Sequence, residues 1–142
     1  MLEKFRDDAV FADAHYWIAM LNPCDQWHQQ VRIVSERLGK VTIVTTDEVL
    51  TEVLNAFSGY GKGPRNAVCG LLYRMRLNKS IVIVEQSRAS FDFGLSLYDA
   101  RNDKGYSLVD CISMNTMRRM VIQRILTADQ HFAQEGFTVL IK

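Results

Sequence analysis

The sequence lacks any apolar run long enough to form a bilayer-spanning helix, and its charged N-terminus lacks the apolar stretch of a secretory signal. These two absences exclude an integral membrane protein and predict a cytoplasmic one. The chain also has little net charge, since 17 Lys and Arg residues against 16 Asp and Glu residues give a formal charge of +1. Nucleic-acid binders often carry a strong positive excess, so the overall charge gives no support for that class.

Cysteine is scarce as well. Cys24, Cys69 and Cys111 are odd in number and widely separated, which argues against a disulfide framework and against a Cys-x-x-Cys metal or redox site. We expect free thiols that mainly fill the core. The glycine-rich segment 58–64 lacks the Gly-Lys-Ser/Thr ending of a phosphate-binding loop, and its glycines predict a mobile loop or hinge.

The chain does have the size and apolar content of one folded unit. With 142 residues, 48% of them hydrophobic, it is long enough for one compact core and too short for two ordinary domains. Short β-branched runs predict strands at residues 10–12, 41–45, 81–84, 124–127 and 138–141. Between them, helical patterns span residues 15–21, 25–38, 47–58, 64–77, 88–102, 108–120 and 130–134. Because most of these strands are continuous apolar runs, we expect a parallel sheet covered by helices on both faces.

Four acidic residues stand out because each abuts a segment that should be buried: Asp13, Glu52, Asp110 and Asp129. Asp13 and Asp129 follow predicted strands, so both should lie at the sheet edge where parallel sheets bind ligands. Glu52 falls at the border of the apolar face of its helix, and Asp110 lies on a helix that is apolar nearly all round. Carboxylates near a core repel one another and lose hydration, so they need hydrogen-bond donors, a shared proton or a cation. A hard divalent metal ion meets that need.

Each acid also has an ordinary explanation. Asp13 and Asp129 suit helix caps, Glu52 suits a solvated helix face, and the spacing from Ser107 to Asp110 resembles a capping box. Capping alone does not explain why two separate strand ends carry acids on the same predicted edge of the sheet. Basic residues form two clusters, which are either solvated helix faces or a phosphate-facing rim around the acids: Lys62, Arg65, Arg74, Arg76 and Lys79, and Arg118, Arg119 and Arg124.

Four segments of the chain match the motifs of a known family. They are Val10-Phe11-Ala12-Asp13, Thr45-Thr46-Asp47-Glu48-Val49-Leu50-Thr51-Glu52, Tyr106-Ser107-Leu108-Val109-Asp110-Cys111 and Leu126-Thr127-Ala128-Asp129-Gln130-His131-Phe132. On these segments the chain resembles the PIN-domain ribonucleases, and most closely the VapC-like toxins of bacterial toxin–antitoxin pairs. The resemblance covers almost the whole chain. It implies a single PIN-like nuclease domain over residues 1–142, built as a three-layer α/β/α sandwich with a mainly parallel five-stranded sheet.

The resemblance also implies a function and a site. It places the family's acidic catalytic and metal-binding residues on Asp13, Glu52, Asp110 and Asp129. The implied protein is a metal-dependent endoribonuclease that hydrolyses RNA, forms a homodimer and is blocked by an antitoxin protein. Where family members often have small hydroxyl residues after the first Asp, this chain has Ala14 and His15. Thr45 or Thr46 would then be the accessory hydroxyl.

The type of ligand indicates the type of metal. An all-carboxylate site favours Mg²⁺ or Mn²⁺ over zinc, because hard oxygen donors suit those ions and the three histidines show no paired zinc spacing. One or two such ions would activate a water for in-line attack on a phosphodiester.

Three other functional classes are alternatives to a nuclease. An aspartyl-phosphate phosphatase needs a second Asp two residues after Asp13, where His15 stands. A phosphoacceptor signalling domain needs a strand-end lysine, and none follows Leu126-Thr127. The strongest alternative is a catalytically inactive PIN-fold interaction module.

Overall fold

The computed structural model describes residues 8–142, so the prediction about an N-terminal signal lies outside the described residues. Within that range five strands form one sheet: β1 (Ala9–Ala12), β2 (Thr42–Thr46), β3 (Ile81–Val84), β4 (Arg124–Leu126) and β5 (Thr138–Val139). Their order is β3-β2-β1-β4-β5, and each neighbouring pair is parallel. All residues of the central strand β1 are buried, as its unbroken apolar sequence predicts.

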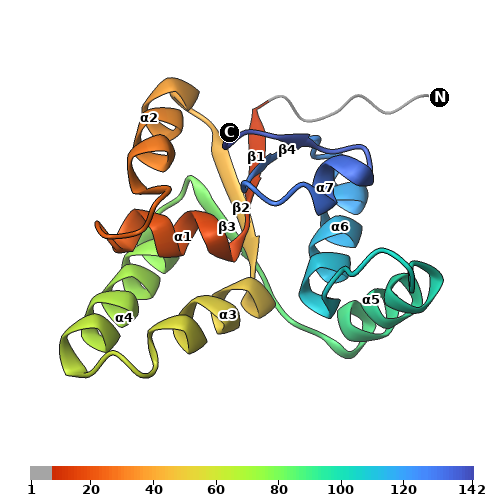
Figure 1. Cartoon of the computed structure of the whole chain (residues 1–142), viewed down its shortest axis with the longest axis horizontal. Helices are drawn as coiled ribbons and strands as arrows, with labels where there is room; N and C mark the ends of the chain where they lie inside the picture. The colour runs from red at the N-terminus through yellow and green to blue at the C-terminus, as the bar shows by residue number, and fades with distance from the viewer. Residues whose placement is uncertain (1–7) are drawn as a thin grey trace.

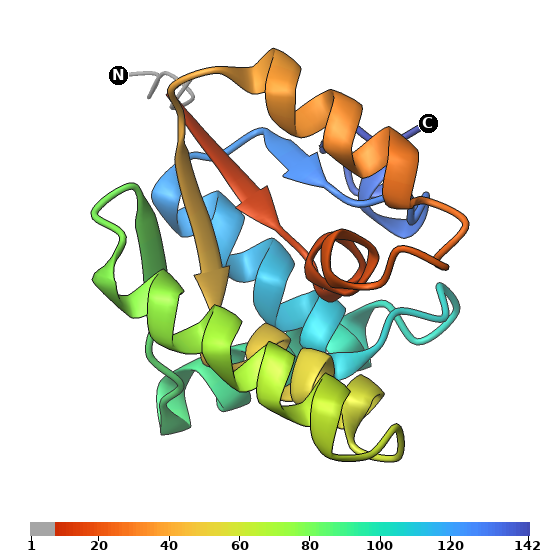
Figure 2. The same cartoon turned by 90° about the vertical axis from the view of Figure 1, so that its left-hand side faces the viewer.

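Seven helices of residues 8–142 accompany the strands: α1 (Ala14–Leu21), α2 (His28–Leu38), α3 (Asp47–Phe57), α4 (Lys62–Leu77), α5 (Arg88–Ala100), α6 (Leu108–Met120) and α7 (His131–Gln134). Helices α1, α2 and α4 lie on one side of the sheet, and α5 and α6 lie on the other (Figure 1, Figure 2). The predicted α/β/α architecture is therefore confirmed. None of the helices in the described range is long and apolar enough to cross a membrane.

Two predicted helix starts differ from the structure by more than one residue. Helix α2 begins at His28 rather than at residue 25, because the Asp25 side chain accepts a hydrogen bond from the Trp27 N–H at 2.8 Å and holds this segment in a turn. Helix α4 begins at Lys62, so Pro64 lies in its first turn, where the missing N–H of proline is tolerated. The last three residues of the segment predicted as a glycine-rich hinge, 62–64, are therefore the start of a helix. Its connection bends at Gly61, whose φ of 90° favours glycine.

The three thiols are free, as predicted, but only one of them fills the core. Cys111 is buried in α6, whereas Cys24 in the α1–α2 connection and Cys69 in α4 are exposed. The expectation that the cysteines mainly serve as core residues is therefore wrong. A small apolar residue is equally compatible with either face of a helix, and the packing of its neighbours decides its burial.

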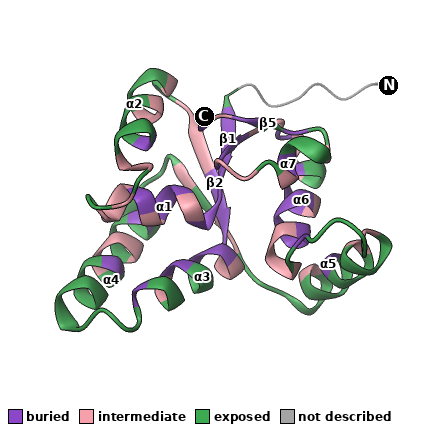
Figure 3. Cartoon of the chain, in the orientation of Figure 1, coloured by how far each residue is buried: buried purple, intermediate pink, exposed green. Residues whose placement is uncertain are grey.

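The core lies where the sheet meets the helices on its two sides (Figure 3). Met114 and Met117 of α6 are fully buried, and burial of side chains of this size contributes about 1.5–3 kcal/mol each. Helix α5 packs so closely against α6 that a side chain at position 94 would collide with Ile112. Gly94 thus permits the close approach. Helix α6 packs against the core on one side and against α5 on the other. These contacts also fix the position of its first turn, which carries Asp110.

Candidate metal centre

The strand order reverses between β1 and β4. From β1 the chain adds β2 and β3 on one side, and it later adds β4 and β5 on the other. Asp13 directly follows β1, and Asp129 follows β4 after Thr127 and Ala128. Both acids therefore lie at the carboxyl ends of the two strands that flank the reversal, which is where open parallel sheets bind ligands. The sequence-based placement of these two residues agrees with the topology.

Asp13 is nearly buried, with 8% of its surface exposed. Its Oδ2 accepts a hydrogen bond from Thr127 Oγ1 at 3.1 Å. Burial raises the pKa of Asp13 to about 7, despite the lowering effect of the Ala14 backbone N–H. The negative charges of Asp110 and Glu52 contribute to the same rise. Without a cation, this carboxyl is therefore only partly ionised at neutral pH.

The buried hydroxyl of Thr127 joins Asp13 to Asp129. It donates to Asp13 Oδ2, and it accepts the backbone N–H of Asp129 at 3.2 Å. Asp129 Oδ1 in turn accepts the backbone N–H of His131 at 2.9 Å, which orients this carboxylate at the start of α7. Two acids from different strands are thus held in place by one connected set of hydrogen bonds.

Asp110 is fixed in the first turn of α6 by a capping box with Ser107, as their spacing predicted. The Ser107 N–H donates to Asp110 Oδ2, and the Asp110 N–H donates to Ser107 Oγ, each at 3.0 Å. Burial raises the pKa of Asp110 in spite of these bonds, and the charge of Asp129 adds to the rise. A carboxylate has about four acceptor positions, so the cap leaves Asp110 with capacity to bind a cation.

Glu52 lies on α3, where it is exposed to solvent. Partial desolvation by the surrounding protein nevertheless raises its pKa, and the charge of Asp110 raises it further. The structure thus brings the four predicted acids into one electrostatic group. In that group Asp13 interacts with Glu52 and with Asp110, and Asp110 interacts with Glu52 and with Asp129.

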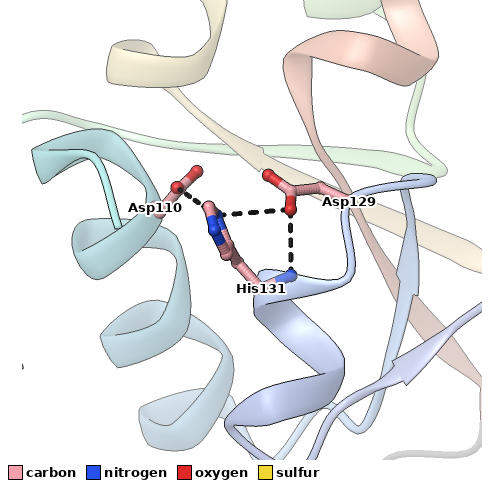
Figure 4. A group of neighbouring side chains, drawn as sticks. All are labelled: Asp110, Asp129 and His131. Atoms are coloured by element: carbon pink, nitrogen blue, oxygen red, sulfur yellow. Dashed lines mark hydrogen bonds and ion pairs between the residues drawn. The ribbon is translucent and has the colours of Figure 1, made fainter. Parts of the chain in front are cut away.

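His131 lies between two of these acids (Figure 4). Its Nδ1 is 3.3 Å from Asp129 Oδ1 and 3.9 Å from Asp110 Oδ2. One potential ligand atom from each of the three residues lies within 4.8 Å of the other two. His131 was not among the predicted site residues, because the three histidines lack the paired spacing of a zinc site. The available signal was its position two residues after Asp129, in a turn that follows a strand.

The two predicted accessory hydroxyls make structural hydrogen bonds. Thr45 Oγ1 donates to the Ala12 carbonyl at 2.9 Å and ties β2 to β1. Thr46 Oγ1 caps α3 by accepting a hydrogen bond from the Val49 N–H at 3.1 Å. The hydroxyl that contacts an acid of the group is that of Thr127, which the sequence analysis did not single out.

A second acid, Glu135, has a side chain only 8% exposed and is surrounded by hydrogen-bond donors, two of them positively charged. It accepts hydrogen bonds from three donors: Arg118 Nη2 at 2.9 Å, the Tyr106 hydroxyl at 3.0 Å and Arg101 Nε at 3.1 Å. Burial acts to raise the pKa of Glu135, but the hydrogen bonds from these donors bring it below its ordinary value. Arg118, from one of the two basic clusters, therefore has a structural role and also lies over the Phe137 ring.

The acidic group fits a hard divalent cation. Among residues 8–142, the neighbouring charges that shift the pKa values of Asp13 and Glu52 are carboxylates, and His131 opposes them only at Asp110. In the described range, no arginine or lysine side chain thus compensates the charges of Asp13 and Glu52 in the way that Arg101 and Arg118 compensate the charge of Glu135. Oxygen donors gathered in this way are the ligands that Mg²⁺ and Mn²⁺ prefer.

Comparison with known proteins identifies a structural relative. No protein-family model matches the chain, and no curated protein matches it significantly. Among solved structures, the chain superposes on VapC20 of Mycobacterium tuberculosis with a TM-score of 0.80. The two proteins share a fold. The match covers 91% of this chain and 96% of VapC20 at 20% sequence identity, and VapC20 is described as a toxin that cleaves the sarcin-ricin loop. The fold expected from the resemblance to VapC-like PIN domains is therefore confirmed.

Proposed function

We propose that this protein is a metal-dependent endoribonuclease that hydrolyses RNA phosphodiester bonds and is the toxin of a toxin–antitoxin pair. The proposed catalytic and metal-binding residues are Asp13, Glu52, Asp110 and Asp129, with Mg²⁺ or Mn²⁺ as the cofactor. The supporting observation is the group of uncompensated carboxylates at the reversal point of a VapC20-like sheet. Perturbed pKa values with a specific physical cause are typical of functional sites.

Within this proposal the four acids have different tasks. Asp13 and Asp110 are the direct ligands, and Glu52 and Asp129 bind a second ion or hold its water molecules. A bound divalent ion supplies Lewis-acid chemistry, since it lowers the pKa of water and stabilises negative charge on phosphate oxygens. The protein contributes fixed ligand positions: Thr127 orients Asp13 and the backbone of Asp129, and the Ser107 capping box orients Asp110. Ligands held in this way need little rearrangement to bind or react.

RNA is the proposed substrate because the structural relative VapC20 is described as cleaving an RNA loop. Phosphate is repelled by an acidic centre until a cation occupies it, so binding of RNA and binding of metal should be coupled. The basic residues of the first cluster are exposed on and next to α4, where they suit sequence-independent contacts to an RNA backbone: Lys62, Arg65, Arg74, Arg76 and Lys79.

A cleavage assay with matched variants tests the function. Purified protein with Mg²⁺ or Mn²⁺ should cleave RNA, with a sarcin-ricin loop oligonucleotide among the substrates, and EDTA should stop the reaction. Asp13→Asn and Asp110→Asn should each lower the cleavage rate by about 100-fold or more, because each removes a charged ligand worth several kcal/mol. Asp103→Asn is the matched control, since Asp103 is a solvent-exposed acid beside Lys104. It should cleave like the wild type.

Two outcomes contradict the proposal. Equal residual cleavage by the wild type and by Asp13→Asn would attribute the activity to a contaminant. A folded wild type that binds Mg²⁺ or Mn²⁺ but cleaves no RNA would instead favour a catalytically inactive interaction module.

A homodimer, an antitoxin partner and a cytoplasmic location belong to the same proposal. Residues 49–77 contribute to the core through Val53 and Val68 and expose Tyr73 and Leu77. Helix α5 presents further exposed apolar side chains: Phe91, Phe93, Leu95 and Tyr98. Apolar surfaces of this kind suit protein partners. Light scattering should give about twice the chain mass of 16.3 kDa, and a monomeric mass would contradict the homodimer.

A further inference from the structure

The imidazole of His131 is held so that Nδ1 faces the acidic group. The ring of Tyr106 packs edge-on against it, with ring centroids 5.3 Å apart. Tyr106 is itself anchored through its hydroxyl to Glu135. The backbone N–H of His131 is bonded to Asp129 Oδ1. These contacts fix both ends of the residue and leave Nδ1 pointing between Asp110 and Asp129 (Figure 4).

The His131 side chain is 34% exposed, and its Nδ1 atom lies at ion-pair distance from both acids without forming a hydrogen bond of good geometry to either. The Nδ1 atom itself is inaccessible to solvent and has no hydrogen-bond partner within residues 8–142. Its separations of 3.3 Å from Asp129 and 3.9 Å from Asp110 are longer than typical hydrogen bonds. They do suit a shared ion. Metal–ligand bonds of about 2.1 Å place neighbouring ligand atoms of an octahedral ion roughly 3.0 Å apart and opposite ones roughly 4.2 Å apart.

We propose that His131 Nδ1 is a ligand of the second cation, which Asp129 binds and Asp110 shares, and that this nitrogen makes the site of that cation prefer Mn²⁺ to Mg²⁺. The inference rests on the proposed function, which supplies the cation. Mg²⁺ demands oxygen ligands in near-ideal octahedral geometry, whereas imidazole is a better ligand for transition-metal ions. One imidazole among carboxylates therefore shifts the metal preference of an otherwise all-oxygen site towards Mn²⁺. The centre would be selective through a residue that belongs to none of the four predicted acids.

Ion binding and pulsed electron paramagnetic resonance test this assignment without relying on cleavage. With Mn²⁺ bound, the wild type should show ¹⁴N coupling from a directly bound imidazole, and calorimetry should give tighter binding of Mn²⁺ than of Mg²⁺. His131→Ala should lose the ¹⁴N coupling and should bind Mn²⁺ about 10-fold more weakly or worse. Its affinity for Mg²⁺ should fall less.

Two further variants separate ligation from a structural role. His131→Asn places an amide oxygen near the position of Nδ1, so it should retain Mg²⁺ binding, lose the ¹⁴N coupling and lose the preference for Mn²⁺. His15→Asn is the control, because His15 also lies within the electrostatic influence of Asp129 but packs edge-on against Trp27. It should keep the ¹⁴N coupling.

The possible failures are distinguishable. If the wild type binds neither ion, the proposed function fails together with this inference. If the wild type binds Mn²⁺ without ¹⁴N coupling, or if His131→Asn keeps the wild-type preference for Mn²⁺, the ligand assignment alone is overturned. Loss of the coupling in His15→Asn would also overturn it, since another histidine would then be the ligand.

Discussion

Asp13 is a buried residue and the side chain of Glu135 is only 8% exposed, but the charges around the two carboxylates have opposite signs. Two arginines and a tyrosine hydroxyl donate to Glu135, and the pKa of that residue lies below its ordinary value. Asp13 faces two other acids, and burial together with their charges raises its pKa to about 7. Burial therefore does not by itself mark a functional acid. The charge of the neighbours separates a carboxylate that stabilises the fold from one whose charge is left uncompensated.

The largest expected effect on stability is at the compensated carboxylate. Glu135→Gln should lower the free energy of unfolding by about 2–3 kcal/mol, because Arg101 and Arg118 lose their anionic partner. The value stays below that of a fully buried pair, since both arginines are about 40% exposed. Urea denaturation at pH 8 in EDTA measures the change.

The pH dependence of this contribution has a defined sign. The folded-state pKa of Glu135 is lowered, so its stabilisation is present above the unfolded pKa of about 4.5 and is lost as the pH falls through the folded value. A variant as stable as the wild type at pH 8 would show that the two arginines are not a stabilising pair for Glu135.

The same chemical change at Asp13 should have the opposite effect. Asp13→Asn should raise the free energy of unfolding of the ion-free protein at pH 8, on the order of 2 kcal/mol, because it removes a charge that the folded state disfavours. The folded pKa of Asp13 lies above its ordinary value of 3.8, so between roughly pH 4 and 7 the folded state binds more protons than the unfolded state. Stability of the ion-free wild type should therefore decrease as the pH rises across this window.

Unfolding measured from pH 4 to 8 in EDTA checks the Asp13 prediction. The variant should lose the part of the slope that Asp13 causes and keep the part due to Glu52 and Asp110, whose pKa values are also raised. An Asp13→Asn variant that is less stable than the wild type at pH 8 would remove the contrast between the two carboxylates.

The smallest effect is expected at the hydroxyl that supports the uncompensated acid. Thr127→Val removes one donor to Asp13 and one acceptor for the Asp129 N–H, and it should cost about 1 kcal/mol of stability. It should also raise the pKa of Asp13 further, because the lost hydrogen bond favours the ionised form. Thr127→Ser keeps the hydroxyl and is the control. Carboxyl titration followed by NMR measures both variants, and an unchanged Asp13 titration in Thr127→Val would contradict the proposed support.

The sequence allowed the two strand-end acids to be placed because their position depends on a simple rule. Asp13 and Asp129 each follow an apolar run, and the carboxyl ends of parallel strands meet on one edge of the sheet. The cap roles of Thr46 and of Ser107 with Asp110 were also predictable, because capping depends on local spacing.

The environment of Glu135 was not predictable in this way. Its partners Arg101, Tyr106 and Arg118 come from separate parts of the chain and meet only through packing. The same holds for Thr127, whose bond partner Asp13 is distant in the sequence. Local patterns locate the acids, but long-range packing decides which of them are neutralised.

The hydrogen bond from Thr127 to Asp13 joins residues that are 114 positions apart. Contacts of such high sequence separation form late, because the chain entropy of closing the loop must be overcome first. During synthesis the N-terminal strand leaves the ribosome first, and β4 follows only after more than a hundred further residues. The acidic group is therefore incomplete until β4 and the residues that follow it have been made and have packed beside β1. The proposed metal centre thus forms late in folding, only after its two strand-end acids have been brought together.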